Sequence, residues 1–254
     1  MSNGWPRVTV SGWGEPKKGK SHFALTFPEP IQAIEIGETG IEDLLNKPEF
    51  RDKKITHTPI TMPVLSPEVA DHQKLLTRFE KVLLDSVKLD SGYRTLVIDS
   101  ASRLWRSVRL VMTEKALEDS IRKKRSQADY ELANDYFEQI IQLVRVKPDL
   151  NLVLLHRHRD VWRTQTDENG RDRSGATGEV EARDYKGIEN MVQVVLKFNT
   201  GTRFDAKTKG QIESFMHTIQ LCRPNHRVVG LTVPDLDYNT LMERVWGRAA
   251  AATE

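Results

Sequence analysis

Apolar residues fall into short runs along the chain, and longer amphipathic segments separate these runs. The first run, at 8–10, alternates with polar residues, whereas later runs at 31–37, 93–100 and 150–156 are richer in apolar residues. Alternation predicts a half-buried strand, and a continuous apolar centre such as 96–98 favours a strand that a parallel sheet buries on both faces. The pattern therefore predicts a sheet with buried parallel strands.

The segments between these runs are mostly helical in character. Helices are predicted over 21–27, 66–88, 101–119 and 127–146, and the apolar residues of the second of these form a stripe along one face. The segment 41–65 contains three prolines, which interrupt regular structure. We therefore expect an irregular connection at 41–65.

The last third of the chain changes in character. Residues 157–186 are polar, and an Asn-Gly dipeptide within them is typical of a hairpin turn. Strands are predicted at 190–198 and 213–222, with 199–210 as their connector. These strands follow one another without a helix between them, so an antiparallel addition to the sheet is expected.

Strands that alternate with helices imply an α/β fold with a mainly parallel central sheet flanked by helices and antiparallel additions toward the C-terminus. The chain has 254 residues, which fits one large domain. We expect a single domain over 1–240, with 241–254 as the end of a C-terminal helix or a frayed tail.

Composition narrows the class of protein. Apolar residues make up 38% of the chain and charged residues 29%, which is typical of a soluble globular protein. No window approaches 18 consecutive apolar residues and the first residues lack a signal pattern, so no membrane span or membrane partner is expected. The single cysteine, Cys222, excludes an internal disulfide and favours a cytoplasmic location. A net charge of +2 does not by itself indicate a nucleic-acid partner.

One loop combines glycine, proline and lysine between the first predicted strand and the first predicted helix. It follows the pattern G-x-x-x-x-G-K-[ST], in which backbone N–H groups surround a triphosphate. Lys20 would reach the β- and γ-phosphates, and the Ser21 hydroxyl would ligate Mg²⁺. The alternative is a Gly-rich surface turn with solvated lysines. The predicted nucleotide-binding residues are Gly14, Glu15, Pro16, Lys17, Lys18, Gly19, Lys20, Ser21 and His22.

A phosphate loop needs further groups for the metal and for water. Asp99 closes an apolar strand and would hold Mg²⁺ together with Ser21, with a helix N-cap as its alternative role. Glu38 follows the second strand and is well placed to activate water, although a solvated loop charge has the same pattern. Glu35 lies within that strand, where a structural role is the alternative. His156 ends a later strand and would hydrogen-bond the γ-phosphate unless it is only a surface residue.

Basic residues gather in two segments, one between two predicted helices and one after the strand at 150–156. Basic groups track phosphates and an aromatic ring can stack on a base, so both segments are candidates for binding single-stranded DNA. The alternatives are a solvated helix end for the first segment and partial burial of the tryptophan in a hairpin for the second. The candidates are Arg122, Lys123, Lys124 and Arg125 in the first segment and Arg157, Arg159, Trp162 and Arg163 in the second.

Four stretches carry a resemblance to a known family: GWGEPKKGKS, AIEIGETG, TLVIDSASRLW and LVLLHRHRD. In their order and spacing the chain resembles the RecA-like recombinase ATPases. It looks most like their compact phage-encoded relatives, which are associated with single-strand annealing and recombination. The resemblance covers roughly residues 7–222 and is most specific in the phosphate loop and the strand that ends at Asp99.

This resemblance implies a RecA-like P-loop NTPase fold with ATP and Mg²⁺ as ligands. Glu38 would polarise the attacking water, His156 would sense the γ-phosphate, and the two basic segments would be the DNA-binding loops. The resemblance also implies self-association into a ring or filament, in which Arg183, Lys186 or Arg203 would act on a neighbour's ATP. A single-stranded DNA-binding protein is a further implied partner.

The sequence leaves three functions open. The first is a Mg²⁺-dependent ATPase that binds single-stranded DNA in phage recombination or replication, in the cytoplasm of the host cell. The second is a small-molecule kinase that uses the same phosphate loop, with 157–186 as its lid. The third is an assembly module that binds a nucleotide without hydrolysing it.

Overall fold

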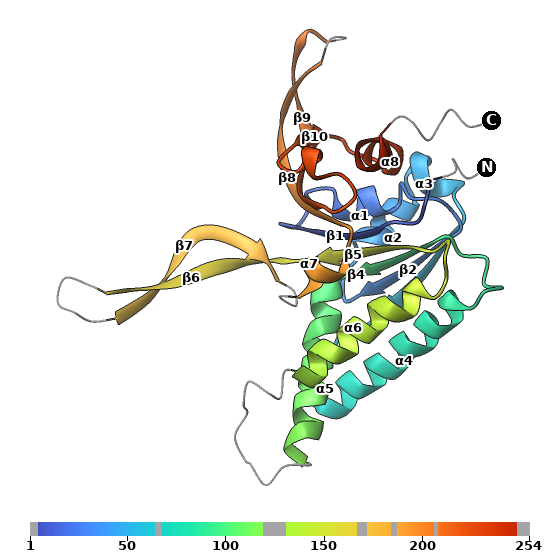
Figure 1. Cartoon of the computed structure of the whole chain (residues 1–254), viewed down its shortest axis with the longest axis vertical. Coiled ribbons are helices and arrows are strands. Elements are labelled where there is room, and N and C mark those ends of the chain that lie inside the picture. The colour runs from blue at the N-terminus through green and yellow to red at the C-terminus, as the bar shows by residue number, and fades with distance from the viewer. Residues whose placement is uncertain are drawn as a thin grey trace.

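The computed structural model describes residues 5–63, 68–118, 131–166, 172–183, 187–205 and 208–247. Eight strands within these ranges pair into one sheet, in the order β10-β9-β8-β1-β5-β4-β2-β3 (Figure 1). Six neighbouring strands, from β8 to β3, run parallel, whereas β9 and β10 are antiparallel additions. The strands of this sheet are β1 (Thr9–Gly14), β2 (Ile31–Ile36), β3 (Ile55–Ile60), β4 (Thr95–Asp99), β5 (Asn151–His156), β8 (Val194–Asp205), β9 (Gly210–Cys222) and β10 (Thr232–Pro234).

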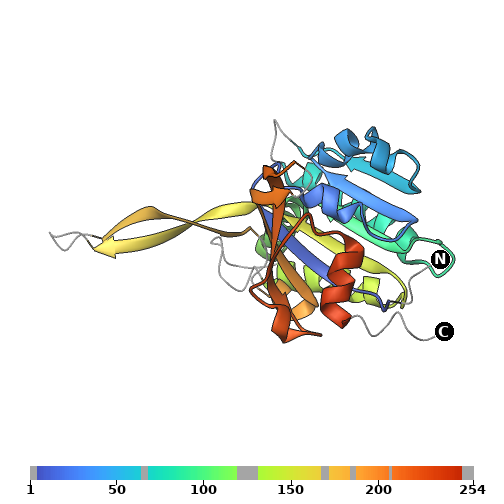
Figure 2. The same cartoon turned by 90° about the horizontal axis from the view of Figure 1, so that it is seen from above.

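Helices cover both faces of the sheet, and each face has its own apolar cluster. One face is covered by four helices: α1 (Lys20–Ala24), α2 (Gly40–Leu45), α3 (Pro48–Arg51) and α8 (Tyr238–Trp246). The other is covered by α4 (Val69–Val87), α5 (Ala101–Glu118), α6 (Glu131–Arg145) and α7 (Ile188–Met191). Figure 2 shows these helices on the two sides of the sheet. None of the helices in the described ranges combines the length and apolar character needed to span a bilayer.

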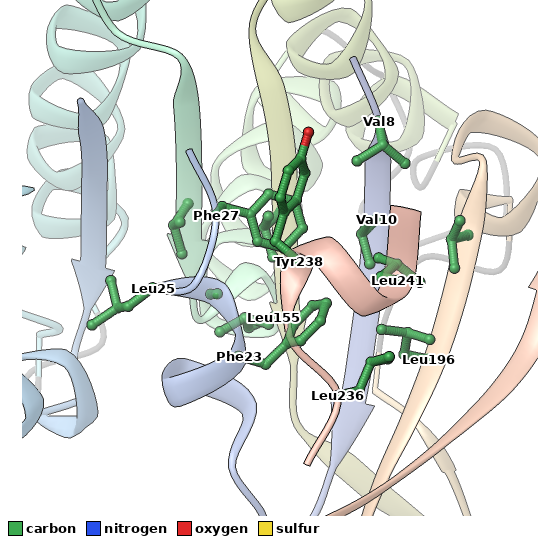
Figure 3. Packing of buried hydrophobic residues seen from close by; sticks show 14 of the residues in the cluster. Val8, Val10, Phe23, Leu25, Phe27, Leu155, Leu196, Leu236, Tyr238 and Leu241 are labelled. Atoms are coloured by element: carbon green, nitrogen blue, oxygen red, sulfur yellow. The ribbon is translucent and has the colours of Figure 1, made fainter. Parts of the chain in front are cut away.

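The first cluster anchors the segment that follows the phosphate loop. Phe23 and Phe27 of this segment are fully buried, and the Phe27 ring lies 4.9 Å from the ring of Tyr238 between centroids (Figure 3). The backbone N–H of Tyr238 also donates to Thr26 Oγ1 at 2.9 Å. The Asp237 side chain caps α8 by accepting from the backbone N–H of residue 240 at 2.8 Å. Helix α8 therefore fixes the segment that follows α1 against the sheet.

Two long strand pairs extend from this body. The first is a two-stranded ribbon of β6 (His158–Thr166) and β7 (Asp172–Ala182), which projects away from the sheet and the helices (Figures 1 and 2). The second is the hairpin of β8 and β9, which extends past the parallel strands (Figure 1). The predicted hairpin within 157–186 is therefore confirmed, although its Asn-Gly dipeptide lies outside the described residues.

Two expected loops are instead regular structure. The segment 41–65 contains most of α2, all of α3 and the edge strand β3, so the prediction of an irregular connection is wrong. Its prolines are compatible with these elements, because Pro48 is the first residue of α3 and Pro59 lies in an edge strand. The predicted connector at 199–210 is also wrong in most of its length, since β8 continues to Asp205 and β9 starts at Gly210.

The carboxyl ends of four parallel strands meet at one edge of the sheet. Glu35 of β2 is in register with Asp99 of β4, and Trp13 of β1 is in register with His156 of β5. Residue 155 of β5 is in turn the neighbour of Asp99. Ligands of open α/β sheets bind beyond such carboxyl ends, where loops carry side chains from several strands. The predicted phosphate loop lies at this edge.

Candidate nucleotide-binding site

The phosphate loop joins β1 to α1 and curls around the ammonium group of Lys20. Lys20 Nζ donates to the carbonyl oxygen of Gly14 at 2.9 Å and to that of Glu15 at 2.6 Å. Burial lowers the pKa of Lys20, and the carboxylates of Asp99 and Glu38 oppose that effect. The lysine is thus held inside the loop by two carbonyl groups, in a position from which it can turn toward an anion.

Gly19 allows the loop to turn into α1. Its φ of 83° lies in the left-handed region that only glycine adopts without strain. A Cβ atom at this position would lie 2.7 Å from the ring of Phe215, which comes from β9. Lys18 Nζ also donates to Thr200 Oγ1 of β8 at 2.9 Å. The β8–β9 hairpin therefore packs directly on the phosphate loop.

Ser21 and Asp99 are brought together, as the sequence predicts for a metal site. Ser21 Oγ donates to Asp99 Oδ2 at 2.7 Å. Burial raises the pKa of Asp99 to about 6, and the hydrogen bond from Ser21 lowers it less than burial raises it. Among the described residues no group of three or more metal-binding side chains gathers anywhere. A magnesium ion would here take one hydroxyl, one carboxylate and further oxygens from phosphate or water.

Glu38 is held by two arginines. Arg157 takes both carboxylate oxygens, with Nε donating to Oε1 at 2.6 Å and Nη2 donating to Oε2 at 2.9 Å. Arg103 of α5 donates through Nε to Oε1 at 3.1 Å. The hydrogen bond to Glu38 raises the pKa of Arg157, whereas burial lowers the pKa of Arg103. The carboxylate that was expected to activate water is therefore part of an ion-pair cluster.

Glu35 has a structural role beneath this cluster. Its side chain is buried, with Oε1 accepting from the backbone N–H of Ile41 at 2.8 Å. Its other oxygen lies 2.8 Å from Nε2 of His57 on the edge strand β3. These contacts fix the start of α2 to β2, and the turn between them carries Glu38. The structural alternative for Glu35 is the one that these contacts favour.

His156 is buried and has no hydrogen-bond partner on either ring nitrogen. Burial lowers its pKa to about 3, so the ring is neutral near pH 7. The hydroxyls of Ser11 and Ser100 are also buried without a partner. Unpaired buried polar atoms are costly in the folded state, and a functional site is a common reason for keeping them. The surface alternative for His156 is therefore wrong.

A cavity of about 420 Å³ lies between the phosphate loop and the turn after β2. Seven predicted residues line it: Gly14, Pro16, Lys17, Lys20, Glu38, Asp99 and His156. Arg157 and Arg183 also line the cavity, although the sequence suggested a role in DNA binding for the first and in a neighbour's ATP site for the second. The lining that sequence reasoning missed is Thr39, Gly40, Asp43, Ser100 and His158. The predicted nucleotide-binding residues that do not line this cavity are Glu15, Lys18, Gly19, Ser21 and His22. The His22 ring instead contacts Glu49 and the ring of Phe50.

The residues around this cavity fit a magnesium-bound triphosphate. Lys17 and Lys20 supply positive charge, the Ser21 hydroxyl and the Asp99 carboxylate beside the cavity suit the metal, and His156 supplies an unpaired polar atom. Glycine at residue 19 lets the loop close against β9, because an added Cβ would meet the Phe215 ring. The chemistry of the donor set therefore agrees with the pattern read from the sequence.

A second cavity, of about 500 Å³, lies between α5 and the base of the ribbon. We call it the basic groove, and it is lined by Ser102, Trp105, Arg106, Arg109, His158, Arg159, Asp160, Trp162 and Arg183. Trp162 is 64% exposed, so its partial burial in the hairpin is not observed. The residues that α5 contributes were missed, because their helical spacing alone resembles that of any solvated face.

The remaining predicted residues are less informative. The basic run at 122–125 and Lys186 lie outside the described residues, as does the side chain of Arg163. Arg159 forms an ion pair with Glu181 across the ribbon, at 2.7 Å between Nε and Oε1. Arg203 pairs with Asp235 at 3.1 Å. These pairs are half exposed, and the structure leaves their predicted roles as predictions.

Together, the sheet order and the phosphate loop define a protein with a RecA-like P-loop fold. Residues 7–228 match the AAA domain family, and because this match covers most of the chain, the protein belongs to that family. Among solved structures the chain is similar to the crystal structure of the RadB recombinase. The two are 13% identical, with 91% of this chain and 87% of that chain covered and a TM-score of 0.50. This likeness confirms the fold expected from the sequence. No curated protein matches the chain.

Proposed function

We propose that this protein binds and hydrolyses Mg·ATP and couples the reaction to the binding of single-stranded DNA. The observation that carries the proposal is the position of the two cavities. His158 and Arg183 line both of them, so the nucleotide-binding cavity and the basic groove meet at the base of the ribbon. A single DNA strand bound in the basic groove would therefore contact His158 and Arg183, which also line the nucleotide-binding cavity.

The residues of the first cavity divide the work of hydrolysis. Lys20 neutralises charge on the β- and γ-phosphates, while Ser21 and Asp99 hold Mg²⁺. Glu38 accepts a proton from water as the water oxygen bonds to the γ-phosphorus and the bond to the bridging oxygen breaks. The products are ADP and inorganic phosphate. His156, which is neutral and unpaired, donates a hydrogen bond to the γ-phosphate and reports its loss.

The basic groove suits a single strand. Arg106, Arg159 and Arg183 are exposed along it, and Trp162 presents an exposed ring. Arginine side chains bind phosphates and an exposed aromatic ring stacks on a base, largely without sequence preference. We therefore propose that this groove, continued by the predicted residues outside the described ranges, is the DNA-binding surface.

The proposal extends to assembly and context. RadB, which is named a recombinase, is similar in fold, and this supports a role in recombination. We propose self-association into a ring or filament, with Arg203 reaching a neighbour's ATP, since Arg183 lines the cavity of its own chain. We also propose a phage-encoded role in the host cytoplasm, with residues 1–240 as one ATPase domain and a single-stranded DNA-binding protein as partner.

The test is steady-state ATP turnover with and without a single-stranded oligonucleotide. We expect the oligonucleotide to stimulate turnover, and duplex DNA of equal length to stimulate it less. Turnover that needs a small-molecule acceptor and ignores DNA would identify a kinase instead. Tight nucleotide binding without turnover, unchanged by Glu38→Gln, would identify a non-hydrolysing assembly module.

A further inference from the structure

The ion pair of Glu38 with Arg157 has a direct covalent and hydrogen-bonded link to the ribbon. Arg157 is the single residue between β5, which ends at His156, and β6, which starts at His158. Its side chain enters the nucleotide-binding cavity, whereas the next residues along the chain line the basic groove. A displacement of the first residues of β6 is therefore transmitted directly to the backbone of Arg157.

Hydrogen bonds fix the base of the ribbon beside Arg157. The backbone N–H of Arg157 donates to Ser102 Oγ at 3.0 Å, and its carbonyl accepts from the backbone N–H of Arg183 at 2.7 Å. Ser102 Oγ also donates to the carbonyl of Arg183. Ser102 belongs to α5 and lies three positions after Asp99. Its hydroxyl therefore links α5 to the residue before β6 and to the residue after β7.

The two arginines on Glu38 differ in how they are attached. Arg103 lies in α5 and packs over Gly37, where an added Cβ would clash with its guanidinium. Arg103 donates to Oε1, whereas Oε2 accepts from Arg157 and from no other side chain in the described residues. If Arg157 left, Arg103 would keep Glu38 in position and Oε2 would become available to water.

A carboxylate that accepts two hydrogen bonds from one guanidinium is a weak acceptor for a proton, because a charged bidentate pair is among the strongest side-chain interactions. We propose that Arg157 is a positioning residue that holds Glu38 inactive, and that a single strand in the basic groove draws Arg157 away and frees Oε2. This inference rests on the proposed function, since it explains how DNA in one cavity would stimulate hydrolysis in the other.

The coupling must act in both directions, because linkage between two equilibria is reciprocal. A DNA strand that must break the Glu38–Arg157 ion pair when it binds has a lower affinity than a DNA strand that binds a protein without this ion pair. The first test therefore measures the affinity of the nucleotide-free protein for a labelled oligothymidine by fluorescence anisotropy. We expect Glu38→Gln to tighten binding by about fivefold or more, the lower end of typical coupling between sites.

Loss of one negative charge also tightens DNA binding in a general way, so a matched control is needed. Asp43 lines the same cavity, and Asp43→Asn removes the same charge without touching the ion pair. We expect Asp43→Asn to have a much smaller effect than Glu38→Gln. Equal effects of the two substitutions would overturn the inference while leaving the proposed function intact.

The second test compares ATP turnover with and without the oligonucleotide. Arg157→Leu should raise the rate without DNA toward the stimulated rate of the wild type, with KM for ATP unchanged. Arg157→Lys, which can make one contact in place of two, should give an intermediate ratio. Arg78→Leu, at an exposed site on α4, is the matched control and should behave as wild type.

The outcomes distinguish a failure of the role of Arg157 from a failure of the proposed function. A DNA-stimulated wild type with an Arg157→Leu variant whose DNA-free rate is unchanged or lower would overturn the role of Arg157 alone. A wild type that neither hydrolyses ATP nor binds the oligonucleotide would overturn the proposed function as well. Should Arg157→Leu fail to fold, Arg157→Lys and the affinity measurement on Glu38→Gln still decide the question.

Discussion

Ser21 Oγ donates a hydrogen bond of 2.7 Å to Asp99 Oδ2, and this contact joins the phosphate loop to the end of β4 across 78 positions of the chain. Burial raises the pKa of this Asp99 to about 6. The carboxylate therefore stays charged near pH 7 at a cost in folding free energy, which a bound cation would offset. Substitutions that remove this charge should therefore change the free energy of unfolding measurably.

We predict that Asp99→Asn stabilises the nucleotide-free protein above pH 6. The pKa of Asp99 is higher in the native state than in the unfolded chain, so the native state holds the extra proton between about pH 4 and 6. The contribution of Asp99 to the free energy of unfolding therefore falls as pH rises through that window. Asparagine removes this cost, which is about 3 kcal/mol at pH 7.5 as an upper limit.

The check is urea unfolding of both proteins at pH 5 and pH 7.5 without nucleotide. The advantage of Asp99→Asn should shrink toward about half at pH 5, because the wild-type carboxyl is then mostly protonated in the native state. Mg²⁺ should strengthen nucleotide binding to the wild type and much less to the variant. A variant that is less stable than wild type at pH 7.5 would contradict this account.

Lys20→Ala should weaken binding of Mg·ATP by about a hundredfold or more, since a charge-assisted contact to phosphate inside a partly buried loop contributes about 3 kcal/mol. Isothermal titration calorimetry measures this directly. Lys81→Ala, at an exposed site on α4, serves as the control for loss of one positive charge. Equal affinities of the two variants would place the nucleotide elsewhere.

How far the sequence predicts this site depends on how local each signal is. Gly19, Lys20 and Ser21 follow one another in a motif, and Asp99 ends an apolar run, so sequence alone was enough to pair Ser21 with Asp99. Arg103 carries no such signal. Its contact with Glu38 depends on how α5 packs beside the turn after β2, which periodicity does not specify.

The errors in the fold have a similar origin. A proline at residue 59 predicts an interruption of regular structure, but β3 is an edge strand, where a missing N–H costs no ladder hydrogen bond on its free side. The stretch at 199–210 is polar because this part of the β8–β9 hairpin extends past the sheet and buries little, and Phe204 there is 68% exposed. The apolar patterns that indicate a buried strand are therefore weak in β3 and in the outer part of the β8–β9 hairpin.

His156→Leu should stabilise the nucleotide-free protein, because both ring nitrogens are buried without a partner and each such group costs about 1–3 kcal/mol. The gain should grow by about 2 kcal/mol from pH 7.5 to pH 5, since the native state resists protonation of a histidine whose pKa is about 3 while the unfolded chain accepts the proton. Thermal or urea unfolding at the two pH values gives the numbers.

The same position should matter for nucleotide response. His156→Gln keeps a neutral donor at the end of β5 and should retain stimulation of turnover by DNA, whereas His156→Leu should lose it. Stimulation that survives in the leucine variant would mean that this histidine is only a packing residue.

Gly19→Ala should destabilise the protein by about 2–4 kcal/mol, because alanine is strained at a φ of 83° and its Cβ would lie 2.7 Å from the Phe215 ring. Phe215→Ala in the same chain should recover the steric part and leave the backbone part. A double-mutant cycle by urea unfolding measures this coupling. Additive effects of the two substitutions would show that the β8–β9 hairpin does not press on the loop.

The basic groove should bind a single strand through two separable contacts. Arg106→Ala should weaken oligonucleotide binding and reduce the slope of log K against log salt by about 0.7, because one phosphate contact is lost on a single strand. Trp162→Ala should weaken binding by about 1–3 kcal/mol with the slope unchanged, because stacking releases no counterions. Trp162→Phe should restore most of that loss, and Arg78→Ala should alter neither quantity. If Trp162→Ala changes the salt slope as Arg106→Ala does, the ring does not stack on a base and the groove acts only through charge.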